Sequence, residues 1–389
     1  MMPVSGSAYT YGYATLGEIF GWIIGWDLLL EYMVAAVLVS TGWSAYFVNL
    51  VDHILAPLGR ELPHRFCASP WDPTPGLFNL PAVLILFCIT ALLVRGIRES
   101  SRANMAIVIV KLAVIVFFIG VTAWHVNPTL WHPFMPFGFG GVMTAAAIVF
   151  LAYVGFDAVS TAAEEAVNPQ KDMPIGILGS LAVSTILYMV VAAIMTGIVP
   201  YGKLGVADPI ALVLNSLHMP WASMVISVGA LAGITSVLLV LMLGQPRILF
   251  SMSRDGLLPP ALARVHSRFK TPHMTTSLTG IIVMAFAAFT PINVSSELCS
   301  IGTLFAFLIV CAGVMVLRYR RPELPRHFKV PFFPALPAAG VLLCGYLMVN
   351  LPRSAWERFF VWLILGLVIY GCYGYWHSRL AATSRGPAV

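Results

Sequence analysis

Long apolar stretches alternate with short polar connections along most of this sequence. Ten of these stretches are long enough to cross a bilayer as helices, because one crossing needs roughly 20 mostly apolar residues. We expect them at residues 17–50, 78–96, 102–124, 139–164, 174–199, 219–252, 274–290, 297–317, 332–350 and 356–377. The first and the sixth exceed one crossing, so we expect these two helices to tilt or to extend beyond the bilayer.

The apolar residues do not alternate with polar ones, as they would in the strands of a membrane barrel. They cover all sides of each stretch, as in a helix that is buried or faces lipid. Of the 389 residues, 59% are hydrophobic and 10% are charged, whereas a soluble domain usually carries about 25% charged residues. The sequence therefore predicts an all-α polytopic membrane protein with a single transmembrane domain, residues 1–389.

The basic residues fall mostly in every second connection, which indicates the orientation of the chain. If the N-terminus is cytoplasmic, a minority of the 22 Lys and Arg residues lie in the outer loops. This minority comprises Arg60, Arg65, Lys203, Arg353 and Arg358. An excess of Lys and Arg in the inner loops is typical of membrane proteins, so we expect both termini in the cytoplasm.

The net charge of +6 therefore reflects topology. A nucleic-acid-binding protein would gather its basic residues on one folded face, and their dispersal over alternate loops excludes that partner. The six cysteines lack the spacing of a zinc site or a disulfide framework, so we interpret them as packing residues. No cluster of His, Cys or acids gathers at one membrane face, and we expect neither an enzyme nor a metal site.

The segment 138–174 carries the clearest functional signal, because polar groups interrupt an apolar span. Gly155 and Asp157 lie in the middle of the stretch at 139–164. An Asp at membrane depth costs roughly 3 kcal/mol, and it is tolerated where the helix breaks and lines a polar cavity. A broken helix exposes carbonyls at one half and amides at the other, which suit the two ends of an amino-acid zwitterion. The alternative is a glycine kink, with Asp157 capping the second half-helix.

Two more acids lie in the first stretch. Glu31 follows Asp27 by four residues, so both lie on one face of a helix. We interpret Asp27, which is next to Trp26, as an interfacial residue near a membrane boundary. Glu31 lies deeper, and an acid at that depth favours a cavity over the interface.

Lys111 is a cation inside the stretch at 102–124. It lies about 13 Å along the helix from Arg102, too deep for its side chain to reach the inner surface easily. We therefore expect it to pair with carbonyls or an acid in the bundle. A fixed ammonium at this depth can stand where a sodium-coupled carrier holds Na⁺, and a structural ion pair is the equal alternative.

Six sequence motifs, spread over nearly the whole chain, resemble those of one known family in sequence and in order. They are PVSGSAYTYGYATLGE at 3–18, GWDLLLEY at 25–32, RGIRESSRANMAIVIVKLAVI at 95–115, FLAYVGFDAVSTAAEEAVNPQKDMPIGI at 150–177, GQPRILFSMSRDGLLP at 244–259 and IGTLFAFLIVCAGVMVLRYRRPELPRHFKVP at 301–331. In these motifs the sequence resembles the amino acid–polyamine–organocation superfamily and, within it, the cationic amino acid transporter group.

The resemblance implies a core of ten helices in two inverted five-helix repeats, followed by two more helices. The first stretch would then correspond to the family's third helix, and the stretch at 139–164 to its unwound sixth helix. The parts would be a connector at 1–16, the remainder of the first repeat at 17–124, the second repeat at 139–317, two additional helices at 332–377 and a cytoplasmic tail at 378–389.

The resemblance also implies where the substrate binds. The unwound stretch would run from Leu151 to Phe156, with Gly155 at the break. The carbonyls of Leu151, Ala152 and Val154 would face the substrate ammonium.

Charged residues complete the implied site. Glu31 matches an acid near the distal end of the substrate, which would suit a cationic side chain, and Asp157 matches an acid just below the unwound turn. Lys111 matches a lysine that replaces the second sodium site, which suggests sodium-independent, proton-coupled uptake without any other cofactor. Arg254 and Asp255 could form inner-gate salt bridges, or could be charged helix ends that follow the topology rule.

The beginning of the chain departs from the family. Residues 1–16 are polar, small and aromatic, unlike a secretory signal, so we interpret them as a connector. Transporters built from inverted repeats have two interrupted helices in corresponding positions, and this sequence shows one. We therefore expect that the family's first two helices are absent, and with them the amides that would hold the substrate carboxylate.

These inferences converge on a secondary active amino-acid permease, working as a symporter. We expect it to move cationic and/or small neutral L-amino acids across the plasma membrane, and the short loops favour a bacterial inner membrane. Its partners would be the amino-acid substrate and the lipid bilayer. The alternative is a truncated, transport-inactive family member, from a mis-assigned start or a decayed gene.

Overall fold

The part of the chain that the computed structural model describes folds into helices joined by turns and loops, and it contains no strand. This part comprises residues 9, 13, 17–72, 74–96, 101–155, 168–206, 208–269, 271–320, 322–323 and 330–378, with the backbone alone described at 101–104 and 169–170. The α-helices are α2 (Glu18–Leu55), α3 (Leu80–Arg95), α4 (Ser101–Thr122), α5 (Gly138–Val149), α7 (Pro169–Ile198), α8 (Pro209–Ser216), α9 (Pro220–Arg254), α10 (His273–Phe289), α11 (Ile292–Arg320), α12 (Ala335–Val349), α13 (Arg353–Ile369) and α14 (Tyr375–His377).

Each expected apolar stretch contains a helix, which confirms the all-α class of a polytopic membrane protein. Six helical segments are long and apolar enough to cross a bilayer, namely Glu18–Leu58, Met105–His125, Lys171–Ile198, Pro220–Arg254, Ile292–Arg320 and Arg353–His377. The number of crossings, expected to be ten, stays a prediction. The short helix α8 was not expected, because its eight residues are too few to form a membrane-length stretch.

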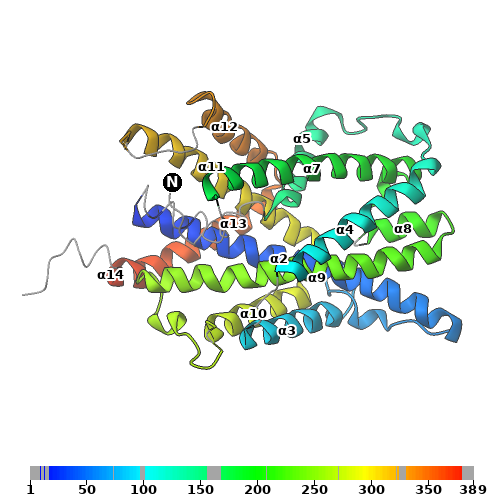
Figure 1. Cartoon of the computed structure of the whole chain (residues 1–389), viewed down its shortest axis with the longest axis horizontal. Coiled ribbons are helices and arrows are strands. Elements are labelled where there is room, and N and C mark those ends of the chain that lie inside the picture. The colour runs from blue at the N-terminus through cyan, green and yellow to red at the C-terminus, as the bar shows by residue number, and fades with distance from the viewer. Residues whose placement is uncertain are drawn as a thin grey trace, which may run out of the picture.

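The core of the bundle is built around α2, which packs against α9 along its length (Figure 1). Gly25 of α2 faces Met252 near the end of α9, so the two backbones approach closely. Near the other end of α2, Asn49 accepts hydrogen bonds from Ser223 and Ser227 at 3.4 and 3.3 Å. The two helices are therefore antiparallel. In the most apolar 18-residue window of α2, 83% of the residues are buried inside the bundle. The corresponding share for α7 is 6%, so α7 lies at the periphery.

Small residues also set the contact between α4 and α9. Gly229 and Gly233 lie one turn apart on α9, where a Cβ atom would meet Val114 and Lys111 of α4 at 2.3 and 3.0 Å respectively. Pairs of small residues four apart are typical of tightly packed membrane helices. The side chain of Lys111 therefore crosses the face of α9 over a glycine.

Tryptophans join α2 to α13. The rings of Trp26 and Trp362 stack with their centroids 4.5 Å apart. The indole N–H of Trp26 donates to the carbonyl of Trp362 at 2.8 Å, and the Trp362 N–H donates to the carbonyl of Trp26 at 3.1 Å. Trp22 stacks on Trp26 and donates to the carbonyl of Gly366 at 3.0 Å. These contacts bury the first turns of α2 beneath α13.

The start of α2 and the end of the described chain lie at one end of the bundle. Glu18 accepts a hydrogen bond from the hydroxyl of Tyr370 at 2.9 Å, and a second from the hydroxyl of Ser378. This arrangement agrees with termini on the same side of a membrane. The assignment of that side to the cytoplasm stays a prediction.

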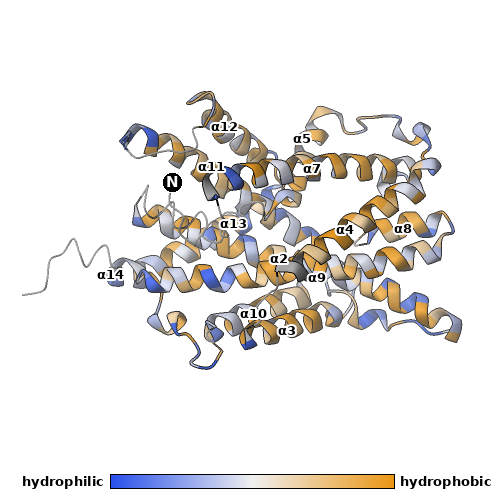
Figure 2. Cartoon of the chain, in the orientation of Figure 1, coloured by the Kyte–Doolittle hydropathy of each residue, from blue (hydrophilic) through white to orange (hydrophobic). Residues whose placement is uncertain are grey.

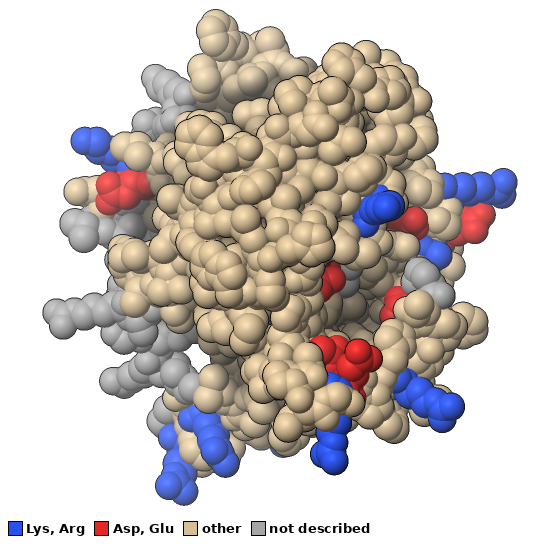
Figure 3. All heavy atoms as spheres, turned by 90° about the vertical axis from the view of Figure 1, so that its right-hand side faces the viewer, with Lys and Arg blue, Asp and Glu red and all other residues tan. Residues whose placement is uncertain are grey.

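The surface suits a lipid environment. Figure 2 shows that α4 and α7 are coloured mostly as hydrophobic, and side chains such as Ile109, Val116 and Met189 are 59–63% exposed. Figure 3 looks onto one end of the bundle, where acidic and basic side chains are scattered over the face and do not form one patch. This dispersal is the pattern expected of loops between membrane helices.

Candidate functional site

The helix α5 breaks where the sequence predicts an interruption. Its α-helical part ends at Val149, and a single 3₁₀ turn follows at Phe150–Tyr153. Val154 is extended, and Gly155 has a φ of +106°, a conformation that residues with a Cβ atom rarely adopt. Phe156 and Asp157 lie outside the described residues, so their predicted roles stay predictions.

Hydrogen bonds hold the broken end of α5 to two neighbouring helices. The hydroxyl of Ser300 on α11 donates to the carbonyl of Ile148 at 2.8 Å. The hydroxyl of Tyr188 on α7 donates to the carbonyl of Ala152 at 2.9 Å. Because carbonyls at a helix end lose their partners within the helix, these two side chains stabilise the break. Neither Ser300 nor Tyr188 was predicted, since a single hydroxyl in an apolar stretch gives no signal of its partner.

Two of the carbonyls that were predicted to be free in the unwound stretch accept hydrogen bonds within the protein. The carbonyl of Leu151 accepts the N–H of Val154 at 3.0 Å, which closes the 3₁₀ turn. The carbonyl of Ala152 accepts the hydroxyl of Tyr188. Each carbonyl oxygen keeps a second lone pair, so the expectation that these groups face a substrate ammonium stays a prediction.

Both acids of α2 lie in the interior. Asp27 and Glu31 are each 1% exposed, so both are buried among helices, and the position of Asp27 relative to a membrane boundary stays a prediction. The ring of the neighbouring Trp26 stacks on Trp362 of α13 and is itself 8% exposed. The helix α13 covers this part of α2, and the sequence of α2 alone does not show that cover.

One turn of α11 connects the acids to the broken helix. Ser300 of α11 contacts the end of α5 through Ile148. Two residues further, Gly302 lies against the carboxylate of Asp27, where a Cβ atom would be 3.2 Å from Oδ1. The acid of the first stretch and the broken end of the fourth stretch thus contact different faces of the same turn of α11. Their spacing in the sequence, more than a hundred residues, gives no hint of this.

Lys111 does not find the partner expected for it within the described residues. It is half-buried, and its methylene groups lie over Gly233 of α9. The ion pairs in this part of the chain are Arg353 with Glu357 and Arg358 with Glu297. Its role as a substitute for a sodium ion therefore stays a prediction.

The predicted inner gate contains a tyrosine that was not expected. Asp255 accepts a hydrogen bond from the hydroxyl of Tyr9 at 2.8 Å, and Tyr9 is 1% exposed beside Gly25. Burial and the nearby Asp255 raise the pKa of the Tyr9 hydroxyl, which therefore stays protonated and donates. Arg254 is exposed, and neither it nor Asp255 forms an ion pair among the described residues. The gating role of these two residues stays a prediction.

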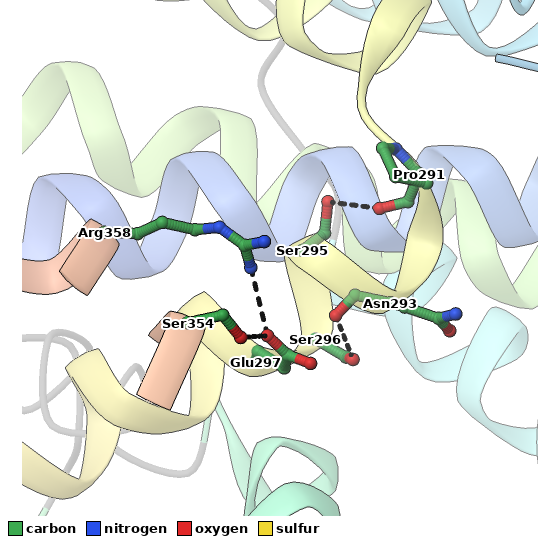
Figure 4. A network of polar contacts seen from close by, with 7 residues as sticks. All are labelled: Pro291, Asn293, Ser295, Ser296, Glu297, Ser354 and Arg358. Atoms are coloured by element: carbon green, nitrogen blue, oxygen red, sulfur yellow. Dashed lines mark hydrogen bonds and ion pairs between the residues drawn. The ribbon is translucent and has the colours of Figure 1, made fainter. Parts of the chain in front are cut away.

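A cavity of about 310 Å³ lies apart from the predicted site, between α2, α10, α11 and α13. The cavity is lined almost entirely by apolar side chains, which include Leu30 and Val34 of α2. Arg358 is the charged residue of the lining. Figure 4 shows that Arg358 already has a partner, Glu297, at 3.0 Å, and that Ser354 donates to the same carboxylate oxygen at 3.1 Å. None of the predicted site residues lines this cavity.

Comparison with known proteins shows what the whole chain is similar to. Residues 1–370 match the family described as amino acid permease. The branched-chain amino acid permease BcaP of Bacillus subtilis (strain 168) is 49% identical over 382 residues, which cover 97% of this chain and 81% of that protein.

Two further relatives carry other names. The methylthioribose transporter of the same organism is 46% identical over 379 residues, covering 97% of this chain and 81% of that protein. The vacuolar cationic amino acid transporter 4 of Arabidopsis thaliana is 35% identical over 331 residues, covering 82% of this chain and 54% of that protein. These relatives are transporters, so the expectation that the chain is not an enzyme is confirmed, as is the resemblance to cationic amino acid transporters. The chain belongs to the amino acid permease family.

Proposed function

We propose that this permease is a proton-coupled, sodium-independent carrier that imports amino acids past the broken end of α5. The observation that carries this proposal is the break itself, where α5 stops at Val149 in an apolar helix and Ser300 and Tyr188 hold the freed carbonyls. Transporters of this kind bind their substrates at interrupted helices near the bilayer midplane. The buried Asp27 of α2, which contacts the same turn of α11 on a different face, supports a polar interior in this part of the bundle.

We propose neutral amino acids with branched apolar side chains as the first substrate class. The 49% identical relative is named for that class and is matched over nearly the whole of this chain. Cationic amino acids are the second class, supported by the buried carboxylate of Glu31 and by the Arabidopsis relative. In either case the ammonium group of the substrate would bind near Val154 and Gly155, and Glu31 would lie nearer its side chain.

Sodium independence is proposed from Lys111. Its methylene groups lie over Gly233 on α9, and the ammonium group at their end would supply the positive charge that Na⁺ supplies in a sodium-coupled carrier. In the plasma membrane of a bacterium, the inward proton gradient would then drive uptake. We propose that Arg254, Asp255 and both termini lie on the cytoplasmic side.

The experiment is uptake of labelled leucine, arginine and alanine by the full chain in proteoliposomes. An imposed inward proton gradient should raise leucine uptake, with Na⁺ and K⁺ outside giving equal rates. Unlabelled methylthioribose should serve as a competitor, which tests the class suggested by the second relative. A requirement for Na⁺ would contradict the proposed coupling, and no uptake of any amino acid would contradict the proposed substrates.

Lys111→Met gives the matched test of the ammonium group, with Lys203→Met as its control. Lys203 lies exposed in the connection between α7 and α8, so its loss should leave uptake unchanged. The Lys111 variant should lose uptake both with and without the proton gradient, because no positive charge then replaces Na⁺ at this position. Orientation is tested in intact cells with a membrane-impermeant thiol reagent, which should label Lys203→Cys at once and Arg254→Cys only after permeabilisation.

A further inference from the structure

Asp27 is a buried carboxyl group without a hydrogen-bond partner. It is 1% exposed, and neither Oδ1 nor Oδ2 has a donor in the part of the chain that the structure describes. Buried polar groups in proteins are nearly always hydrogen-bonded, so an exception calls for an explanation. Gly302 of α11 gives the carboxyl its space, since a Cβ atom there would be 3.2 Å from Oδ1.

The titratable groups that face Asp27 would not neutralise a negative charge on it. Glu31 lies one turn further along α2 and is 1% exposed, and its charge acts on Asp27. Cys299 of α11, also 1% exposed, lies close enough to be affected by both acids. The helices α3, α9, α10 and α13 also pack against α2, and their described residues form no ion pair or hydrogen bond with Asp27.

These surroundings favour a neutral carboxylic acid over a carboxylate. An isolated charge without a partner is strongly disfavoured in a protein interior, and such a group binds a proton instead. A second acid close by adds to this preference, because like charges in one site cannot both be accommodated. A proton on Asp27 would satisfy both conditions.

We propose that Asp27 is the group that binds and releases the coupling proton during transport. In the present conformation its carboxyl O–H is intact and shielded between α2 and α11. When these helices separate enough to admit water, the O–H bond breaks and the proton passes to water on the releasing side. The carboxylate then takes a proton from water on the opposite side in the next cycle. This inference rests on the proposed function, and it assigns the proton to a residue that neither the motifs nor the relatives single out.

The test compares Asp27→Asn with Asp52→Asn. Asp52 lies on the same helix near its outer end and accepts the N–H of Leu62 at 2.8 Å, so its variant controls for loss of an acid from α2. A gradient of one pH unit can drive up to about tenfold accumulation at one proton per substrate. The wild type and Asp52→Asn should accumulate leucine under this gradient. In Asp27→Asn the ratio of accumulation with and without the gradient should fall to one, while exchange of internal for external leucine stays measurable.

A second measurement needs no variant and no transport. Infrared spectra of the purified wild-type chain at neutral pH should contain the carbonyl stretch of a protonated carboxylic acid. This band should shift when the chain is labelled with carboxyl-¹³C aspartate, because exposed aspartates are ionised at that pH. It should disappear in Asp27→Asn and persist in Asp52→Asn.

The outcomes separate this inference from the function on which it rests. If the wild type transports leucine but Asp27→Asn keeps the full response to the pH gradient, Asp27 does not carry the coupling proton, although proton coupling stands. If the aspartate band is missing from the wild type, the inference is overturned even where transport is proton-driven. If the wild type shows no response to the gradient, both the coupling and the role of Asp27 are overturned.

Discussion

The hydrogen bond from Ser300 to Ile148 is the contact that best isolates the break in α5, and Ser300→Ala removes it. The serine is fully buried, and its hydroxyl donates to Ile148 at 2.8 Å. Alanine keeps the helix and nearly the same volume, so the lost donor dominates the change. The carbonyl of Ile148, in a half-buried position, then loses this donor and keeps the N–H of Phe150.

The size of the effect follows from that loss. Loss of one hydrogen bond costs about 0.5–1.5 kcal/mol. At about 2.1 cal/mol/K per residue, the entropy of unfolding for a chain of this length is about 0.8 kcal/mol/K, which converts the loss into a Tm decrease of about 1–2 °C. The matched control is Ser296→Ala on the same helix, where the hydroxyl bonds to Asn293 at 2.8 Å in an exposed position. Such surface changes stay within about 0.5 kcal/mol.

The assay is thermal unfolding of both variants and the wild type in one detergent, followed by the loss of monodisperse protein. Ser300→Ala should melt below Ser296→Ala, and its initial rate of leucine uptake should fall because the break is less well held. Equal melting temperatures for the two variants would refute the reasoning that the hydroxyl of Ser300 stabilises the broken end of α5.

Three further predictions concern packing and pH. Trp362→Phe removes the N–H that bonds to Trp26 at 3.1 Å and should lower the free energy of unfolding by about 0.5–1.5 kcal/mol, measured by the same melting assay. Gly229→Ala should melt below Gly233→Ala, because its Cβ atom would lie 2.3 Å from a stiff valine, whereas that at 233 meets flexible lysine methylenes at 3.0 Å; the reverse order would contradict the assigned α4–α9 contact. Burial raises the pKa of Asp208 to about 6, so the folded state binds a proton more tightly than the unfolded one, whose value is about 3.9. Stability should therefore fall as pH rises from about 4 to 6 and change little from this source above that; Asp208→Asn should flatten this part of the profile of Tm against pH.

The sequence predicts the helices well because each one is long and apolar. The stretch at 219–252, for example, corresponds to α9 at Pro220–Arg254. Met219 is the residue before the helix, and the charged Arg254 is its last residue. The break in α5 is likewise visible from Gly155 within an apolar run. These features are local, so one segment of sequence contains all the information needed.

The features that the sequence does not show depend on a distant segment. The burial of this part of α2 depends on Trp362, which stacks on Trp26, and on Gly302, which lies against Asp27. The occupied carbonyl of Ala152 depends on Tyr188 of α7. Apolar periodicity shows that a helix is covered, but it does not identify the residues that cover it.

The proposed coupling of leucine uptake to proton entry is tested by measuring the internal pH while the substrate enters. Proteoliposomes containing the full chain and an internal pH dye are prepared with equal pH on both sides, and leucine is added outside. The lumen should acidify on addition of leucine, equally in Na⁺ and K⁺ buffers, and empty liposomes should show no change. Leucine uptake without acidification, or acidification that needs Na⁺, would contradict the proposed coupling.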